Sequence, residues 1–112
     1  MERALFYQLG APSPAAYQAL RDEVRLAEEL GLARIFCLPR SDDGGGFAGS
    51  APALWLASLA AETGRIRLGW GLPGLFPPSA PPVREAEQAA TLDVAAAGRL
   101  DMALLPDTSS RP

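Results

Sequence analysis

The chain of 112 residues repeats one pattern at a nearly constant interval. A stretch with helical character ends in glycine at Gly31, Gly64 and Gly98, so the steps between the glycines are 33 and 34 residues. A short run of β-prone apolar residues follows each glycine. Strands that are separated by helices must be parallel, because a hairpin cannot connect them. The repeat therefore predicts an α/β fold in the order βαβαβαβ, and it excludes ankyrin-like solenoids, which lack such strands.

The same pattern predicts the bounds of the elements. Helices are expected over 14–30, 52–63 and 82–98, and strands over 4–9, 34–38, 66–70 and 100–105. Ser13 and Pro14 supply a cap and a first-turn proline for the first helix. The second helix is apolar nearly all round, which predicts burial on more than one side. The third helix carries one apolar face, made of Val83, Ala86, Ala90 and Val94.

Loop lengths predict where a functional site would lie. Each helix passes into the next strand through one to three residues, whereas longer loops follow the first three strands. Sites in α/β proteins lie at the carboxyl ends of the strands, where the longer loops gather. We therefore expect any site at this end of the sheet, which we call the rim. Its expected members are Gly10, Pro39, Arg40, Trp70, Gly71, Leu72, Pro106 and Asp107.

Charge and composition exclude several classes of function. The net charge of −3 and the absence of a basic run argue against binding to nucleic acid. The single Cys37 and the absence of histidine argue against a disulfide scaffold and against a metal site. The sequence shows no signal peptide and no apolar run long enough for a membrane span, so a cytoplasmic location without membrane contact is expected.

Glycine spacings and charges in the repeat have structural interpretations. The spacing G-x-G-x-x-G occurs at 44–49 and 69–74, but neither match joins a strand directly to a helix. We therefore interpret both as a lid or a turn rather than as dinucleotide sites. Arg34, Arg67 and Asp101 each follow a repeat glycine by three residues, which places them at equivalent positions on three strands. They are expected to form an ion-paired belt at the amino ends of the strands.

Three segments resemble the luciferase-like flavin-dependent oxidoreductases, the family that contains bacterial luciferase and deazaflavin-dependent reductases. They are EVRLAEELGL at 23–32, ASLAAETGRIRLG at 57–69, and PVREAEQAATLD at 82–93 followed by GRLD at 98–101. The resemblance implies a (β/α)8 TIM barrel, of which this chain covers about half. It also implies a flavin, either FMN or the deazaflavin coenzyme F420, that lies at the rim and oxidises a small organic substrate, often as a monooxygenase.

The resemblance also suggests which residues would form the site. Gly69, Trp70, Gly71 and Leu72 match the place where the family holds a strained peptide against the flavin ring, so they are the expected cofactor-binding residues. Tyr7, Arg40 and Asp107 are expected at the substrate side of the rim. After the second strand the family carries an acidic residue and histidines, where this chain has PRSD at 39–42. No counterpart of the catalytic histidine exists, so no catalytic residue is assigned.

Three functions follow from these observations. The first is a truncated or split luciferase-like oxidoreductase over a single domain, 1–107, with a tail at 108–112; it is expected to be inactive alone, without the family histidine and the phosphate-binding later half. The second is a non-catalytic interaction or ligand-binding subunit. The third is an open flavodoxin-like sheet that binds a phosphorylated ligand. Since one sheet face would be bare, a homo-oligomer or a complementary partner chain is expected.

Overall fold

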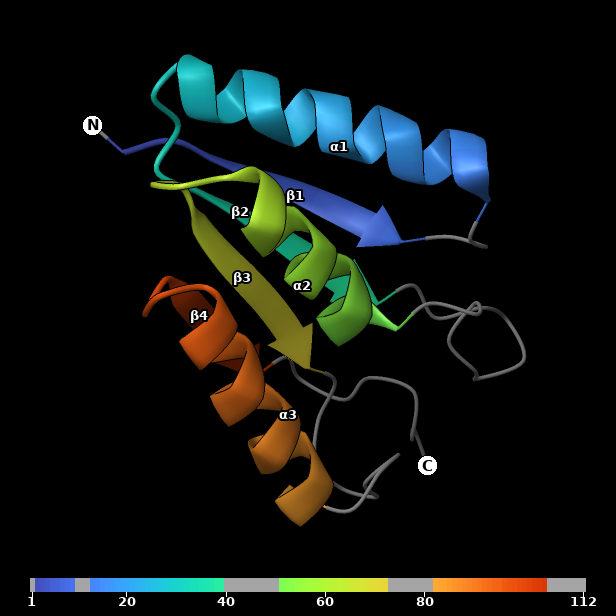
Figure 1. The fold of residues 1–112 in the computed structure, drawn as a ribbon, viewed down its shortest axis with the longest axis vertical. Helices are drawn as coiled ribbons and strands as arrows, with labels where there is room; N and C mark the ends of the chain where they lie inside the picture. Colours follow the sequence, from blue (N-terminus) through green and yellow to red (C-terminus); the bar gives the residue numbers. More distant parts are fainter. Residues whose placement is uncertain (1, 10–12, 40–50, 73–81, 105–112) are drawn as a thin grey trace, which may run out of the picture.

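The computed structural model describes residues 2–9, 13–39, 51–72 and 82–104, and it confirms the predicted order of elements. Three helices alternate with four strands (Figure 1). The elements are β1 (Ala4–Leu9), α1 (Pro14–Glu29), β2 (Arg34–Pro39), α2 (Pro52–Glu62), β3 (Arg67–Leu72), α3 (Pro82–Ala95) and β4 (Leu100–Leu104). None of the described helices combines the length and the apolar character that a bilayer crossing requires.

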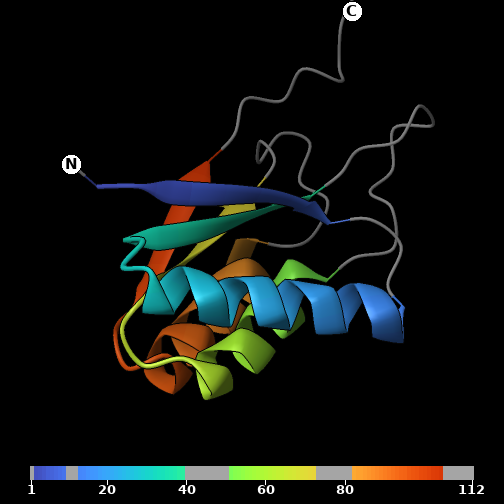
Figure 2. The same cartoon turned by 90° about the horizontal axis from the view of Figure 1, so that it is seen from above.

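The four strands form one parallel sheet with the order β1-β2-β3-β4. All three helices cover the same face of this sheet, which we call the helix side (Figure 2). This arrangement follows from right-handed crossovers that all progress in one direction. The other face, here called the open face, carries no helix in the described part of the chain. A flavodoxin-like sheet reverses its strand order and carries helices on both faces, so the flavodoxin-like alternative is wrong.

Local chemistry explains where the helices begin and end. The Ser13 hydroxyl oxygen accepts a hydrogen bond from the Ala16 amide at 3.0 Å, and Pro14 occupies the first helical turn of α1. Gly31 and Gly98, which follow α1 and α3, both adopt a φ of +83°, a conformation that glycine reaches without strain. The glycines of the repeat therefore end these two helices as predicted.

The hydrophobic core lies between the sheet and the helices. On the inner strands β2 and β3, residues that point to the helix side, such as Ile35, Cys37 and Leu68, are fully buried, because successive side chains of a strand alternate between its two faces. On the edge strands, Leu5, Met102 and Leu104 point to the same side and stay exposed. Each helix contributes one row of buried residues to the core. The ring centroids of Tyr17 and Trp55 lie 4.7 Å apart, so these two side chains pack α1 against α2. The core consists of Leu20, Val24, Ala27, Ile35, Cys37, Leu56, Leu59, Ala60, Ile66, Leu68, Trp70, Leu92 and Ala96.

Two helices pack differently from the sequence prediction. In α2, Leu54 is exposed although the helix is apolar nearly all round, so its outer side is not buried. In α3 the predicted apolar face is exposed, with Val94 at 82 %, and the helix instead buries Leu92 and Ala96. The Asp93 carboxylate accepts a hydrogen bond from the Leu100 amide at 3.2 Å. This bond ties the end of α3 to the start of β4.

Candidate functional site

The open face carries an aromatic patch at its centre. Phe6, Phe36, Gly69 and Asp101 stand side by side across the four strands. The rings of Phe6 and Phe36 stack with centroids 5.3 Å apart and planes at 9°, and the Phe6 side chain is 65 % exposed. Large apolar side chains on this face have no covering layer in the described structure. We call Phe6 and Phe36 the aromatic patch.

Gly69 has a packing role beneath this patch. A Cβ atom added at Gly69 would overlap three ring atoms of Phe36, at distances that real Cβ atoms do not show. The missing side chain therefore makes room for the Phe36 ring. Gly69 and Gly71 both lie within β3, so the first two glycines of the match at 69–74 are strand residues and not part of a turn, while Gly74 lies outside the described residues.

Replacing Gly69 with alanine is expected to lower the free energy of unfolding by about 2 kcal/mol, because the Phe36 ring must leave its place and its stack on Phe6. Urea denaturation measures the change. The matched control is Gly64→Ala, since a Cβ at Gly64 meets no atom within 4 Å. An alanine at Gly69 that costs no more than the control would contradict the packing role.

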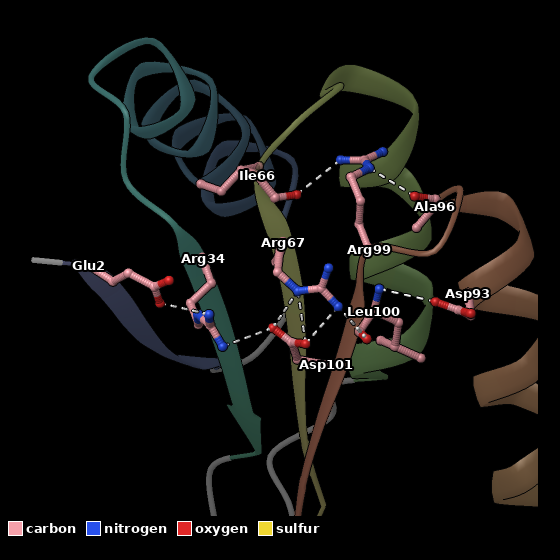
Figure 3. A network of polar contacts seen from close by, with 9 residues as sticks. All are labelled: Glu2, Arg34, Ile66, Arg67, Asp93, Ala96, Arg99, Leu100 and Asp101. Carbon is pink, nitrogen blue, oxygen red and sulfur yellow. Dashed lines mark hydrogen bonds and ion pairs between the residues drawn. The ribbon is translucent and has the colours of Figure 1, made fainter.

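The charged side chains of the open face gather at the amino ends of the strands (Figure 3). Arg34 contacts Glu2 at 2.9 Å and Asp101 at 3.3 Å, and Arg67 contacts Asp101 at 2.9 Å. The hydrogen bond and the charge of Asp101 raise the pKa of Arg67. The predicted ion-paired belt is therefore confirmed, and we call these four residues the charged belt. It lies at the end of the sheet opposite the rim.

The register of β4 corrects one detail of that prediction. Asp101 stands opposite Gly69 and not opposite Arg67, so it does not occupy the position equivalent to the two arginines. Arg34 on β2 still reaches Asp101 on β4, across the intervening strand. Since the β3 residue opposite Asp101 is a glycine, no side chain stands between the two groups. Gly69 therefore makes room for an ion pair as well as for a ring.

Two of the predicted rim residues point away from the open face. The Trp70 side chain is 4 % exposed and belongs to the core on the helix side. Tyr7 also packs against this core, and its hydroxyl is buried without a hydrogen-bond partner among the described residues. Burial, followed by the carboxylate of Glu23, raises the pKa of Tyr7 well above its usual value. A ligand on the open face could meet only the backbone of Trp70.

The remaining predicted site residues are described only in part. Gly71 is buried at the carboxyl end of β3, next to Leu72, whose backbone alone is described. Gly10, Arg40 and the pair at 106–107 lie outside the described residues, as do the first glycine-spacing match at 44–49 and the tail. The structure therefore brings together the backbone of 69–72 and the aromatic patch. The cofactor role of these residues stays a prediction.

The described residues fit part of a flavin. The aromatic patch and the glycine backbone of β3 give a flat apolar surface of the kind that suits a ring system. The arginines of the open face, Arg34 and Arg67, are both paired with acids at the end opposite the rim. Neither of these two arginines is therefore placed to hold a cofactor phosphate at the rim. The open face supports contact with the ring only, and we derive no chemical step from it.

Other reactive groups in the described part have structural explanations. Burial raises the pKa of the Cys37 thiol to about 12, so this thiol stays protonated and is a poor nucleophile. No group of three potential metal ligands occurs among the described residues. The aromatic patch itself was missed by the sequence analysis, although the alternation of Phe36 with Ile35 and Cys37 in β2 could have indicated it.

Known structures share this fold over most of the chain. Monooxygenase RslO1 from Streptomyces bottropensis is 26 % identical, with a TM-score of 0.69 over 93 % of this chain and 32 % of its own. The FMN-bound oxygenating constituent of 3,6-diketocamphane monooxygenase from Pseudomonas putida is 18 % identical, with a TM-score of 0.75 over 100 % of this chain and 31 % of its own. Coenzyme F420 dependent tetrahydromethanopterin reductase from Methanopyrus kandleri is 21 % identical, with a TM-score of 0.68 over 93 % of this chain and 27 % of its own.

The family follows from a comparison with sequence models. A search of curated proteins finds no match. The chain spans about a third of the length of the solved structures that it resembles, and its sheet corresponds to a part of the TIM barrel. The model of the luciferase-like monooxygenases matches residues 4–106, which is nearly the whole chain. The chain therefore belongs to the luciferase-like monooxygenase family.

Proposed function

We propose that this chain forms the first half of a luciferase-like, flavin-dependent oxidoreductase barrel of the monooxygenase type. The observation that carries the proposal is the open face, where the exposed Phe6 and the adjoining Phe36 lie as interior residues of a barrel would. The family match and the solved relatives, two of them monooxygenases, support the same reading. The backbone at 69–72 would form one wall of the cofactor site, beside a small organic substrate in a cytoplasmic protein.

We further propose that the 112-residue chain by itself does not turn over substrate. The sequence contains no histidine, the commonest general base near neutral pH. The charged groups of the open face neutralise one another at the far end of the sheet. Four strands also cannot enclose a cofactor on all sides, and a closed, dry site is what makes electrostatic catalysis effective.

A non-catalytic interaction or ligand-binding subunit is the second candidate. The open face favours it, because an exposed apolar patch on a sheet is typical of a surface that binds another protein. This reading requires neither flavin nor turnover. It differs from the first in one measurable respect, namely whether the chain recognises a flavin at all.

A flavin titration separates the two candidates. We expect the chain to bind FMN weakly, with a Kd above ~0.1 mM, because only the ring would be held. Riboflavin, which has the same ring without the phosphate, is the matched control and should bind equally well. Coenzyme F420 tests the other cofactor of the family in the same assay, which follows quenching of flavin fluorescence.

The outcomes of this titration have different consequences. FMN binding at least tenfold tighter than riboflavin would contradict our expectation that the flavin is held through its ring alone. Oxygenation of an organic substrate by the chain, supplied with reduced flavin and oxygen, would contradict the interaction-subunit candidate and also our proposal that the chain alone does not turn over substrate. Weak but saturable ring binding supports the cofactor part of the proposal, whereas the absence of binding by every flavin overturns that part and leaves an interaction subunit built on the same half-barrel.

A further inference from the structure

We infer that the open face and the two edge strands bind a second copy of this chain. In this arrangement a twofold axis runs parallel to the strands, and β4 of each copy pairs with β1 of the other. The two sheets then enclose both aromatic patches. This inference rests on the half-barrel part of the proposed function and not on flavin binding.

The edge strands carry the first argument. Among the described residues, β1 and β4 each have one strand neighbour, so no described strand pairs with their outer backbone groups. The large apolar side chains that are exposed on described strands all belong to these two strands, with Leu104 at 66 %. They are Leu5 and Phe6 on β1, and Met102 and Leu104 on β4. Apolar residues on both free edges mark both as surfaces that need a neighbour.

The direction of the strands makes a second copy fit these edges. Because the sheet is entirely parallel, rotation about an axis along the strands keeps their direction and exchanges the two edges. β4 of each copy then lies parallel to β1 of the other copy, just as all paired strands within one sheet are parallel. Two sets of four strands also make eight, the number at which a parallel barrel closes around a filled interior.

The charges of the open face permit this contact. The chain carries a net charge of −3, which would oppose self-association through a charged surface. On the open face, however, Glu2 and Asp101 balance Arg34 and Arg67 within one network. Bringing two such faces together therefore adds no net charge to the interior. The repulsion between copies comes from residues elsewhere on the surface, where water and salt screen it.

The helix side limits the strength of the contact. At the seam between β4 and the second copy's β1, no described helix covers the strands, so Met102 and Leu104 stay partly in contact with water. The seam therefore lacks one of the two apolar layers that a complete barrel has. We expect a dimer with a Kd in the range of ~1–50 μM and not a nanomolar complex.

Sedimentation equilibrium without flavin tests the inference. We expect the mass to rise from 11.8 kDa at low concentration to twice that value. Phe6→Lys replaces a stacked ring in the enclosed space with a charge and should raise the dimer Kd at least ~10-fold, because burying a charge in place of an apolar side chain is costly. Val94→Lys is the matched control, because Val94 is exposed on α3, away from the open face. It should leave the Kd unchanged.

A second variant keeps the test decisive if Phe6→Lys fails to fold. Ala103→Lys changes the other edge strand at a residue that stands opposite Gly71 on the open face, and it should weaken the dimer in the same way. A chain that stays monomeric up to ~200 μM overturns the inference, since the expected Kd lies well below that concentration. A dimer whose Kd is unchanged by both edge variants but rises with Val94→Lys also overturns the inference. These outcomes do not depend on flavin, so the flavin titration remains a separate test.

Discussion

Replacing Arg99 with lysine is expected to lower the free energy of unfolding by about 3 kcal/mol, the largest effect among the changes considered. The Arg99 guanidinium donates five hydrogen bonds, to the Ala96 carbonyl and the Thr63 hydroxyl at 2.8 Å, to the carbonyls of Ile66 and Ala60 at 3.1 Å, and to the Thr63 carbonyl at 3.3 Å. One planar group thereby binds the carboxyl ends of both α2 and α3, close to the start of β3 (Figure 3).

Lysine cannot replace this contact because of its geometry. Its ammonium group has three donors at one point, whereas the guanidinium spreads five donors over a plane. Carbonyl groups at the ends of two helices would lose their hydrogen-bond partners. A carbonyl that is shielded from water costs more free energy when it loses its partner than one that water can reach. Urea denaturation of the two proteins at pH 7 measures the difference.

Arg84→Lys is the control for this change. Arg84 lies on the exposed surface of α3, so the same substitution there should alter the free energy of unfolding by no more than about 0.5 kcal/mol. A loss below about 1 kcal/mol for Arg99→Lys would mean that water satisfies the helix ends as well as the guanidinium does. The role of Arg99 as a joint between two helices would then be wrong.

Glu28→Gln is expected to lower the free energy of unfolding by about 2 kcal/mol at pH 7. One oxygen of the Glu28 carboxylate accepts hydrogen bonds from three successive amides, those of Gly64 and Ile66 at 2.9 Å and that of Arg65 at 2.6 Å. The bonds hold the loop between α2 and β3 against the end of α1. A neutral amide accepts the same hydrogens more weakly, because it lacks the negative charge.

This effect should depend on pH in a defined direction. Burial alone raises the pKa of Glu28, but the three amides together outweigh burial and hold the pKa below its usual 4.5. Because the folded pKa is the lower one, the stabilisation is complete above the unfolded pKa and is lost as the pH falls through the folded pKa. The difference between wild type and Glu28→Gln should therefore shrink in acid, below the usual pKa.

Thermal denaturation at pH 7 and at stepwise lower pH measures this dependence. Glu29→Gln is the control, since Glu29 is the exposed neighbour on the same helix turn. Its effect should be small at every pH. A gap between wild type and Glu28→Gln that stays constant into acid would show that the charge of Glu28 contributes nothing to the folded state.

Much of the fold could be predicted because it depends on short-range patterns. The repeat glycines, the Ser13 cap and the apolar strands act within one element, so their bounds agree with the structure to within a few residues. The family could be recognised because its motifs lie within the same segments. The common face of the three helices followed from the handedness of parallel connections.

The failures concern contacts between elements. The end of α3 is tied to β4 by the bond from the Leu100 amide to Asp93, which no periodicity within the helix reveals. The packing role of Gly69 depends on Phe36, a residue of the neighbouring strand. Trp70 looked like a rim residue because it ends a strand in the sequence, but alternation places its side chain in the core. Such features require the register of the sheet.

The polar contacts that join separate elements lie mostly at one end of the sheet. Glu28 and Arg99 bind the ends of helices there, and the charged belt spans the strands nearby. A scaffold that is anchored at one end leaves its opposite end free to vary in sequence. Selection or directed evolution could therefore exchange the loops at the rim with little loss of folding, which is how one architecture comes to serve many substrates.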